Sequence, residues 1–129
     1  IKRLRLSDAV PFCVETSYLP QHRIPGLVAA DVFAAPSLYA LLRERFGMTF
    51  ATSDFHVSVA AAPEIEADLL GLAPGVGALA MRSTVYDRDG QPAEFLISWN
   101  HPDRVAFESL RDDTGPVKSV FTDWASPTL

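Results

Sequence analysis

Two stretches of the chain alternate between apolar and polar residues on both sides of a turn signal, and this pattern restricts the fold most. Residues 1–19 alternate around 7–10, and residues 78–100 alternate around 87–90. Alternation with a period of two is typical of strands that bury one face, and a short polar turn joins such strands into an antiparallel hairpin. We therefore predict two β-hairpins, with the second built from strands at 78–86 and 93–100.

The register of the first hairpin can be predicted from the separation of its apolar and polar side chains onto two faces. Pairing residues whose numbers sum to 18 gives a three-residue loop and separates the side chains into an apolar and a polar face. The apolar face then holds Leu4, Leu6, Phe12 and Val14, and the other face holds Arg3, Arg5, Cys13 and Glu15. A shift by one residue would place the arginines among apolar side chains, so the first register is predicted.

The side chains of the second hairpin also separate into an apolar and a polar face. Its apolar face is predicted to hold Met81, Val85, Ala93, Phe95, Ile97 and Trp99, and its polar face Arg82, Thr84, Glu94, Ser98 and Asn100. Helices are expected to cover the apolar side, which leaves a polar sheet face that is either solvated or lines a pocket.

Two helices and a third strand are predicted between the hairpins. Ser37 suits the N-cap of a helix that Gly47 ends, with an apolar stripe of Leu38, Leu41, Leu42 and Phe46. Residues 52–61 alternate as a strand. A second helix starts at Pro63 and stops near Gly71, with a predicted buried side of Ile65, Leu69 and Leu72. The fold class is therefore α+β, with one domain over residues 1–107 and a tail at 108–129 that packs on the domain or on a partner.

Composition excludes several classes of function. The 129 residues are 48% hydrophobic, which is enough for one domain with its own core. A formal net charge of -5 argues against a nucleic-acid-binding face, because phosphates require a basic one. The sequence has no long apolar run or leader, so no membrane contact is expected. A single cysteine, Cys13, fits a reducing compartment, and the cytoplasm is predicted.

Arg3 and Arg5 are the strongest candidates for a binding role. They lie two residues apart on the polar face, where a pair of guanidinium groups can receive a phosphate or a carboxylate. The alternative is a solvated strand face on which Glu15 is the cross-strand partner of Arg3. Ser37 would add the unpaired amides of a helix start, although capping is its ordinary role. Glu15 and Glu94 could accept hydrogen bonds from ligand hydroxyl or amine groups, or pair with cations on the sheet.

Catalytic and metal-binding motifs are not found. His22, His56 and His101 show no ligand spacing with one another or with Cys13, and no glycine-rich nucleotide loop is present. We predict no metal, no cofactor and no enzyme activity.

Several motifs, in their order and spacing, resemble the UTRA domain, the ligand-binding domain of GntR/HutC transcription regulators. They lie at residues 3–12, 15–20, 36–47, 69–75, 86–92 and 103–104. The resemblance covers about residues 1–107. It implies a chorismate-lyase-like antiparallel sheet with flanking helices, a homodimer, and an upstream winged helix-turn-helix through which alone the regulator contacts DNA. The first strand and helix of the family are expected before Ile1.

The resemblance also implies site residues. In relatives that sense phosphorylated sugars, two strand arginines, a helix-start serine and a glutamate after the first turn contact the ligand. These positions correspond to Arg3, Arg5, Ser37 and Glu15, and Glu94 matches a later pocket glutamate. Asn100, our sixth candidate, and His101 stand where a tyrosine followed by arginine is common, which argues against a sugar phosphate.

The predicted function is a sensor of a small anionic effector. Binding would favour one arrangement of the dimer and so change the spacing of the DNA-binding heads. A lyase related to chorismate lyase and a dimerisation module without a ligand are the alternatives.

Overall fold

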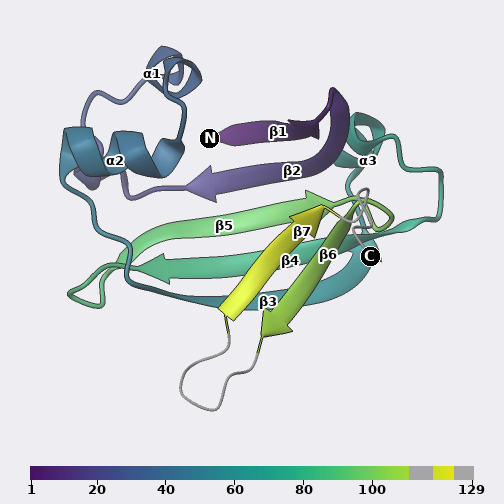
Figure 1. Cartoon of the computed structure of the whole chain (residues 1–129). Helices are drawn as coiled ribbons and strands as arrows, with labels where there is room; N and C mark the ends of the chain where they lie inside the picture. The colour runs from purple at the N-terminus through teal and green to yellow at the C-terminus, as the bar shows by residue number, and fades with distance from the viewer. Residues whose placement is uncertain (111–117, 124–129) are drawn as a thin grey trace. The chain divides into compact units, whose positions relative to one another are not determined.

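The computed structural model describes residues 1–110 and 118–123, with side chains over residues 1–107 (Figure 1). The chain forms two compact units, each assembled from separate stretches of sequence. Unit 1 contains residues 1–3, 15–57 and 81–97, and unit 2 contains residues 4–14, 58–80 and the described residues from 98 onward.

The elements follow one another as β1 (Lys2–Ser7), β2 (Val10–Tyr18), the 3-10 helix η1 (Gln21–Arg23), α1 (Ala29–Ala34), α2 (Leu38–Phe46), β3 (Thr52–Ala61), α3 (Glu64–Leu70), β4 (Gly77–Tyr86), β5 (Pro92–Asn100), β6 (Val105–Leu110) and β7 (Lys118–Asp123). One sheet has the strand order β1-β2-β5-β4-β3, and β6 pairs antiparallel with β7. The predicted α+β class with an antiparallel sheet is confirmed.

The first hairpin has the predicted register where its strands meet in unit 1. Ile1 and Ser17 exchange backbone hydrogen bonds of 2.8 and 2.9 Å, and their numbers sum to 18. The loop, however, has two residues, Asp8 and Ala9, both with positive φ, so the predicted three-residue loop is wrong. Left-handed conformations at both loop positions match the right-handed twist of paired strands, which explains the tighter turn.

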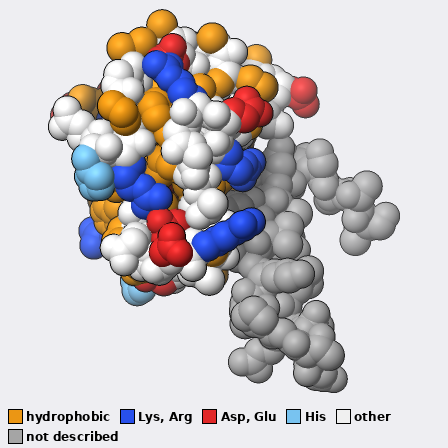
Figure 2. Space-filling model, turned by 90° about the vertical axis from the view of Figure 1, so that its left-hand side faces the viewer, with side chains coloured by type: hydrophobic (Ala, Val, Ile, Leu, Met, Phe, Trp, Pro, Cys, Tyr) orange, Lys and Arg blue, Asp and Glu red, His pale blue; other side chains and the backbone are white. Residues whose placement is uncertain are grey.

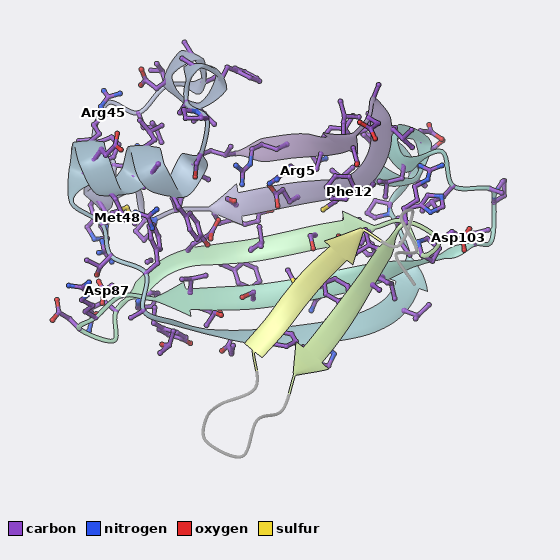
Figure 3. The ribbon with its side chains drawn as sticks, in the orientation of Figure 1. Arg5, Phe12, Arg45, Met48, Asp87 and Asp103 are labelled. Carbon is purple, nitrogen blue, oxygen red and sulfur yellow. The ribbon has the colours of Figure 1, made fainter. Side chains whose placement is uncertain are left out.

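Helix α2 forms as its sequence predicts and supplies the core of unit 1. The Ser37 hydroxyl accepts a hydrogen bond from the Ala40 amide at 3.3 Å, and Gly47 ends the helix in the left-handed conformation with φ 64°. One cluster of buried core residues in unit 1 consists of Leu38, Leu42, Met48 and Ala93. Met48 lies just beyond the helix in Figure 3.

The predicted buried side of α3 is wrong. The helix follows Pro63 and ends at Gly71 as expected, yet Ile65 is 66% exposed and Leu69 is also exposed, whereas Glu66 and Leu70 are buried. A helix of two turns has no periodicity long enough to fix its buried face, so tertiary contacts decide. One such contact is the Leu70 carbonyl, which accepts a hydrogen bond from Arg104 Nη1 at 3.2 Å.

The second hairpin lies where it was predicted. On β4 the burial follows the prediction, since Met81 and Val85 are buried and Arg82 is exposed, whereas on β5 it differs. Glu94, Ser98 and Asn100 on the polar face of β5 are each 2% exposed, whereas Phe95 on the apolar face is exposed. In unit 1, Ala93 and Glu94 on β5 are both buried, because Ala93 packs in the core with Leu38 and Leu42 of α2, and Glu94 accepts a hydrogen bond from Tyr39 of the same helix. Alternation separates two faces without telling which one a helix covers.

Two further findings bear on the sequence predictions. No helix in the described residues is long and apolar enough to cross a membrane. In the predicted tail, β7 pairs with β6, while residues 111–117 and 124–129 lie outside the described residues. The boundary at residue 107 and the packing of the tail on a partner stay predictions.

Candidate functional site

Arg3 and Glu15 form an ion pair across β1 and β2 in unit 1. Arg3 Nη2 lies 2.8 Å from Glu15 Oε1, and the two side chains are 26% and 13% exposed. The two residues oppose each other in the predicted register, so the pairing that was given as the alternative to a ligand role for Arg3 is present in this structure. The pair does not use the whole guanidinium, because Arg3 Nε is buried without a hydrogen-bond partner in the described part of the chain.

A second polar pair lies beside the first. The Tyr39 hydroxyl, in the first turn of α2, donates a hydrogen bond to Glu94 Oε2. The Tyr39 ring stacks on Phe50, with the ring centroids 4.1 Å apart and the planes inclined by 7°. This stacking fixes the ring, and the hydrogen bond then fixes the buried carboxylate of Glu94.

Electrostatics link the two pairs. Burial raises the pKa of Tyr39 well above its usual value, the Glu94 carboxylate raises it further, Glu15 adds to this, and Arg3 opposes it. The Tyr39 hydroxyl therefore stays a proton donor at neutral pH and lies within electrostatic range of the Arg3–Glu15 ion pair. We call Arg3, Glu15, Tyr39 and Glu94 the Arg3 cluster; all four belong to unit 1.

The structure thus brings together three of the six predicted site residues and adds one that the sequence did not indicate. Arg3 pairs with Glu15, Glu94 accepts a hydrogen bond from Tyr39 within electrostatic range of that pair, and Ser37 caps the helix that carries Tyr39. Tyr39 was missed, although an aromatic residue with a polar tip two positions after a helix cap is a signal that could have been used.

The other two candidates lie in unit 2. Arg5, labelled in Figure 3, lies on β1 and is exposed. Asn100 is buried, and its amide nitrogen donates to the Leu79 carbonyl at 3.0 Å and to Ser98 Oγ at 2.9 Å. That Arg5, Ser37 and Asn100 contact an effector stays a prediction.

The histidines take up no arrangement suited to chemistry. His22 and His56 are exposed. His101 is buried in unit 2, where its Nδ1 accepts from the Asp103 amide at 3.2 Å and its own amide donates to the Phe12 carbonyl at 2.9 Å. Burial lowers the pKa of His101, so it stays neutral at pH 7. Within the described residues, no group of three His, Cys, Asp or Glu side chains could hold a metal ion.

Two other arginines of unit 1 support the backbone. Arg23 pairs with Asp87 at 2.8 Å and donates to the Pro92 carbonyl at 3.2 Å, which ties η1 to the turn before β5. Arg45 pairs with Asp31 and donates to the Gly26 carbonyl at 3.2 Å, which holds α1 against α2. Figure 2 shows basic and acidic side chains interspersed on this face of the molecule, without the extended basic field that nucleic acid requires.

The sequence model of the UTRA domain matches residues 1–106. The chain belongs to the UTRA domain family. Among curated relatives, the HTH-type transcriptional regulator Rv0792c of Mycobacterium tuberculosis is 31% identical over 117 residues, which are 89% of this chain and 43% of the relative. The HTH-type transcriptional repressor NagR of Bacillus subtilis is 26% identical over 112 residues, 87% of this chain and 45% of NagR.

Solved structures agree with this assignment. PhnF from Mycobacterium smegmatis superposes on this UTRA domain with a TM-score of 0.78 and 30% identity, covering 88% of this chain and 49% of PhnF. The ligand-binding domain of a regulator assigned to the GntR family, from Bordetella bronchiseptica, gives a TM-score of 0.75 and 25% identity over 79% of this chain and 66% of that domain.

The comparisons confirm the resemblance and the predicted fold. This UTRA domain is the ligand-binding domain of a GntR-family transcription regulator, with a chorismate-lyase-like fold, and its family consists of regulator domains rather than enzymes. The chain spans less than half the length of the curated relatives it matches.

Proposed function

We propose that this UTRA domain binds a small anionic metabolite at the Arg3 cluster. The observation that carries the proposal is the state of Arg3, whose Nη2 pairs with the Glu15 carboxylate while its buried Nε has no hydrogen-bond partner among the described residues. A guanidinium group is a planar fork of donors that suits a phosphate or carboxylate, and Glu15 occupies part of that fork in place of a ligand.

The neighbouring groups suit the uncharged part of the same ligand. Glu15 and Glu94 offer carboxylate oxygens to hydroxyl or amine hydrogens of a metabolite. Ser37 would add the start of α2. Arg5 and Asn100, which belong to unit 2, are proposed as effector-binding residues on the resemblance alone, Asn100 through its amide oxygen, because its amide nitrogen already donates to Leu79 and Ser98.

The whole regulator is proposed to be a cytoplasmic homodimer that contacts DNA through a winged helix-turn-helix outside this chain. An effector that binds one arrangement of the dimer more tightly would change operator affinity by a coupling free energy of about 1–3 kcal/mol. This coupling is tested by measuring operator affinity of the full-length regulator with and without a bound effector. Unchanged affinity would contradict it.

The binding site itself is tested by thermal unfolding. Native protein and Arg3→Ala are compared with inorganic phosphate, glucose 6-phosphate, citrate and putrescine, at constant ionic strength. A ligand present at 100 times its Kd stabilises a domain by about 2.7 kcal/mol, which is readily seen in Tm. We expect an anion to stabilise the native domain and Arg3→Ala to abolish the effect. Arg43→Ala is the control, because Arg43 is exposed on α2. The absence of stabilisation, or an equal loss in both variants, would contradict the site.

A further inference from the structure

A buried hydroxyl close to the Arg3 cluster lacks a hydrogen-bond partner. Ser17 is 1% exposed, and its Oγ has no donor or acceptor in the described part of the chain. The Nε of Arg3 is likewise buried without a hydrogen-bond partner among the described residues. An unpaired buried polar group costs folding free energy, and such groups are rare in native proteins without a functional reason. Both groups belong to unit 1.

Ser17 lies on the same sheet face as the cluster. Glu15 and Ser17 are two residues apart on β2, so their side chains leave the same side of the strand, about 7 Å apart. Tyr18, the residue after Ser17, leaves the opposite side of β2, and its ring centroid lies 6.0 Å from that of Phe95. Since Phe95 directly follows Glu94 on β5, Glu94 and Ser17 both lie on the opposite face from this ring pair.

The Arg3–Glu15 ion pair is the part of this group that a small solute can reach. Its side chains keep some exposure, whereas Ser17 Oγ and Arg3 Nε are closed off from solvent. An anion that competes with Glu15 for the Arg3 guanidinium would turn this long side chain and bring an acceptor next to both unpaired groups.

We infer that Ser17 is a further effector-binding residue, whose hydroxyl, together with Arg3 Nε–H, donates to oxygen atoms of the anionic group of the effector. This inference rests on the proposed function, since it requires an anion at Arg3. Ser17 is neutral, so it would contribute to binding by donating a hydrogen bond rather than by charge.

The test combines Ser17→Ala with the control Thr16→Val, which removes the hydroxyl of the neighbouring residue on the other side of β2. Tm is measured without ligand and with saturating inorganic phosphate at constant ionic strength. Because the variant removes an unpaired buried group, we expect Ser17→Ala to raise the ligand-free Tm by about 2–5 °C. The same variant should lose most of the Tm increase that phosphate causes, and Thr16→Val should keep it.

Three results of this experiment would contradict the inference, and each has a different meaning. A ligand-free Tm that stays unchanged or falls in Ser17→Ala would show that the hydroxyl has a partner, such as a buried water, and would overturn the inference. A phosphate response retained in Ser17→Ala but lost in Arg3→Ala would overturn the role of Ser17 and leave the anion site intact. A native domain that phosphate does not stabilise would overturn a phosphate-binding site and the role of Ser17 together.

Discussion

The Tyr39 hydroxyl donates a hydrogen bond to the Glu94 carboxylate, and this bond joins the first turn of α2 to β5. Glu94 is buried, so Tyr39 replaces a water molecule that the carboxylate would bind if it were exposed. The same bond orients both side chains within the Arg3 cluster. The helix and the candidate site are therefore stabilised by one interaction.

Tyr39→Phe is expected to destabilise the domain, because it leaves the buried carboxylate of Glu94 without its donor. Hydrogen bonds to charged groups contribute about 1.5–3 kcal/mol, and we expect a loss in the free energy of unfolding of that order. Equilibrium unfolding in urea measures it. Tyr18→Phe is the matched control, since Tyr18 is exposed, and it should change the free energy of unfolding by less than about 0.5 kcal/mol. Equal effects of the two substitutions would refute the role given to the Tyr39 hydroxyl.

Stability should fall at alkaline pH because of Tyr39. Burial, and then the Glu94 carboxylate, raise the pKa of Tyr39, so the native state keeps this proton above about pH 10, where an unfolded tyrosine loses it. The unfolded state then binds fewer protons than the native state, and the free energy of unfolding decreases as pH rises. Urea unfolding between about pH 8 and 12 would show this slope in the native protein. Tyr39→Phe should lose it, and parallel pH profiles for the two proteins would contradict the assignment.

Features governed by neighbouring residues could be predicted from the sequence. Ser37 and Gly47 limit α2 as expected, because capping depends on groups within one turn of the helix. The pairing of Arg3 with Glu15 followed from the separation of polar and apolar side chains in the first hairpin. In both cases the determining residues are close in sequence or joined by a short turn.

Features that depend on packing between distant segments could not be predicted. The exposure of Ile65 and the burial of Glu94 are decided by which surfaces meet, and alternation or helical periodicity alone does not contain that information. For the same reason, Tyr39 and Ser17 could not be identified as site residues from the sequence. Their significance lies in a contact with Glu94, in one case, and in a missing hydrogen bond, in the other.

Asp87 should contribute to stability at neutral pH and lose this effect in acid. Its carboxylate accepts the amides of Asp89 and Gln91 at 3.0 and 2.8 Å and pairs with Arg23. The hydrogen bond from Gln91, helped by Arg23 and opposed by burial, lowers the pKa of Asp87. Stability from a carboxyl group with a lowered pKa is present above about pH 4, its unfolded value, and is lost as pH falls through the folded value.

The substitution Asp87→Asn is therefore expected to lower Tm by several degrees at pH 7 and to make the decline in acid shallower. Calorimetry across the acid range measures both effects. Asp89→Asn serves as the control, because the Asp89 side chain is exposed in the same turn, and it should leave Tm and its pH dependence close to native. An equal decline in acid for native protein and Asp87→Asn would exclude Asp87 as the group responsible.

Glu15→Gln is expected to tighten the binding of inorganic phosphate, because Glu15 competes with the anion for Arg3 and repels it. Unit charges about 4 Å apart interact by about 1 kcal/mol under solvent-like screening, which corresponds to roughly a fivefold lower Kd. Calorimetric titration measures the change. Glu44→Gln, an exposed position on α2, controls for the altered net charge and should have little effect.

Glucose 6-phosphate should gain less from Glu15→Gln than inorganic phosphate does. A sugar offers hydroxyl groups to the Glu15 carboxylate, so the substitution removes an acceptor as well as a competing charge. The ratio of the two changes in Kd therefore separates the two roles of Glu15. If Glu15→Gln weakened phosphate binding, the Arg3–Glu15 pair would have to stay intact when the site is filled. In that event an anion would bind to the ion pair as a unit, with Glu15 orienting Arg3.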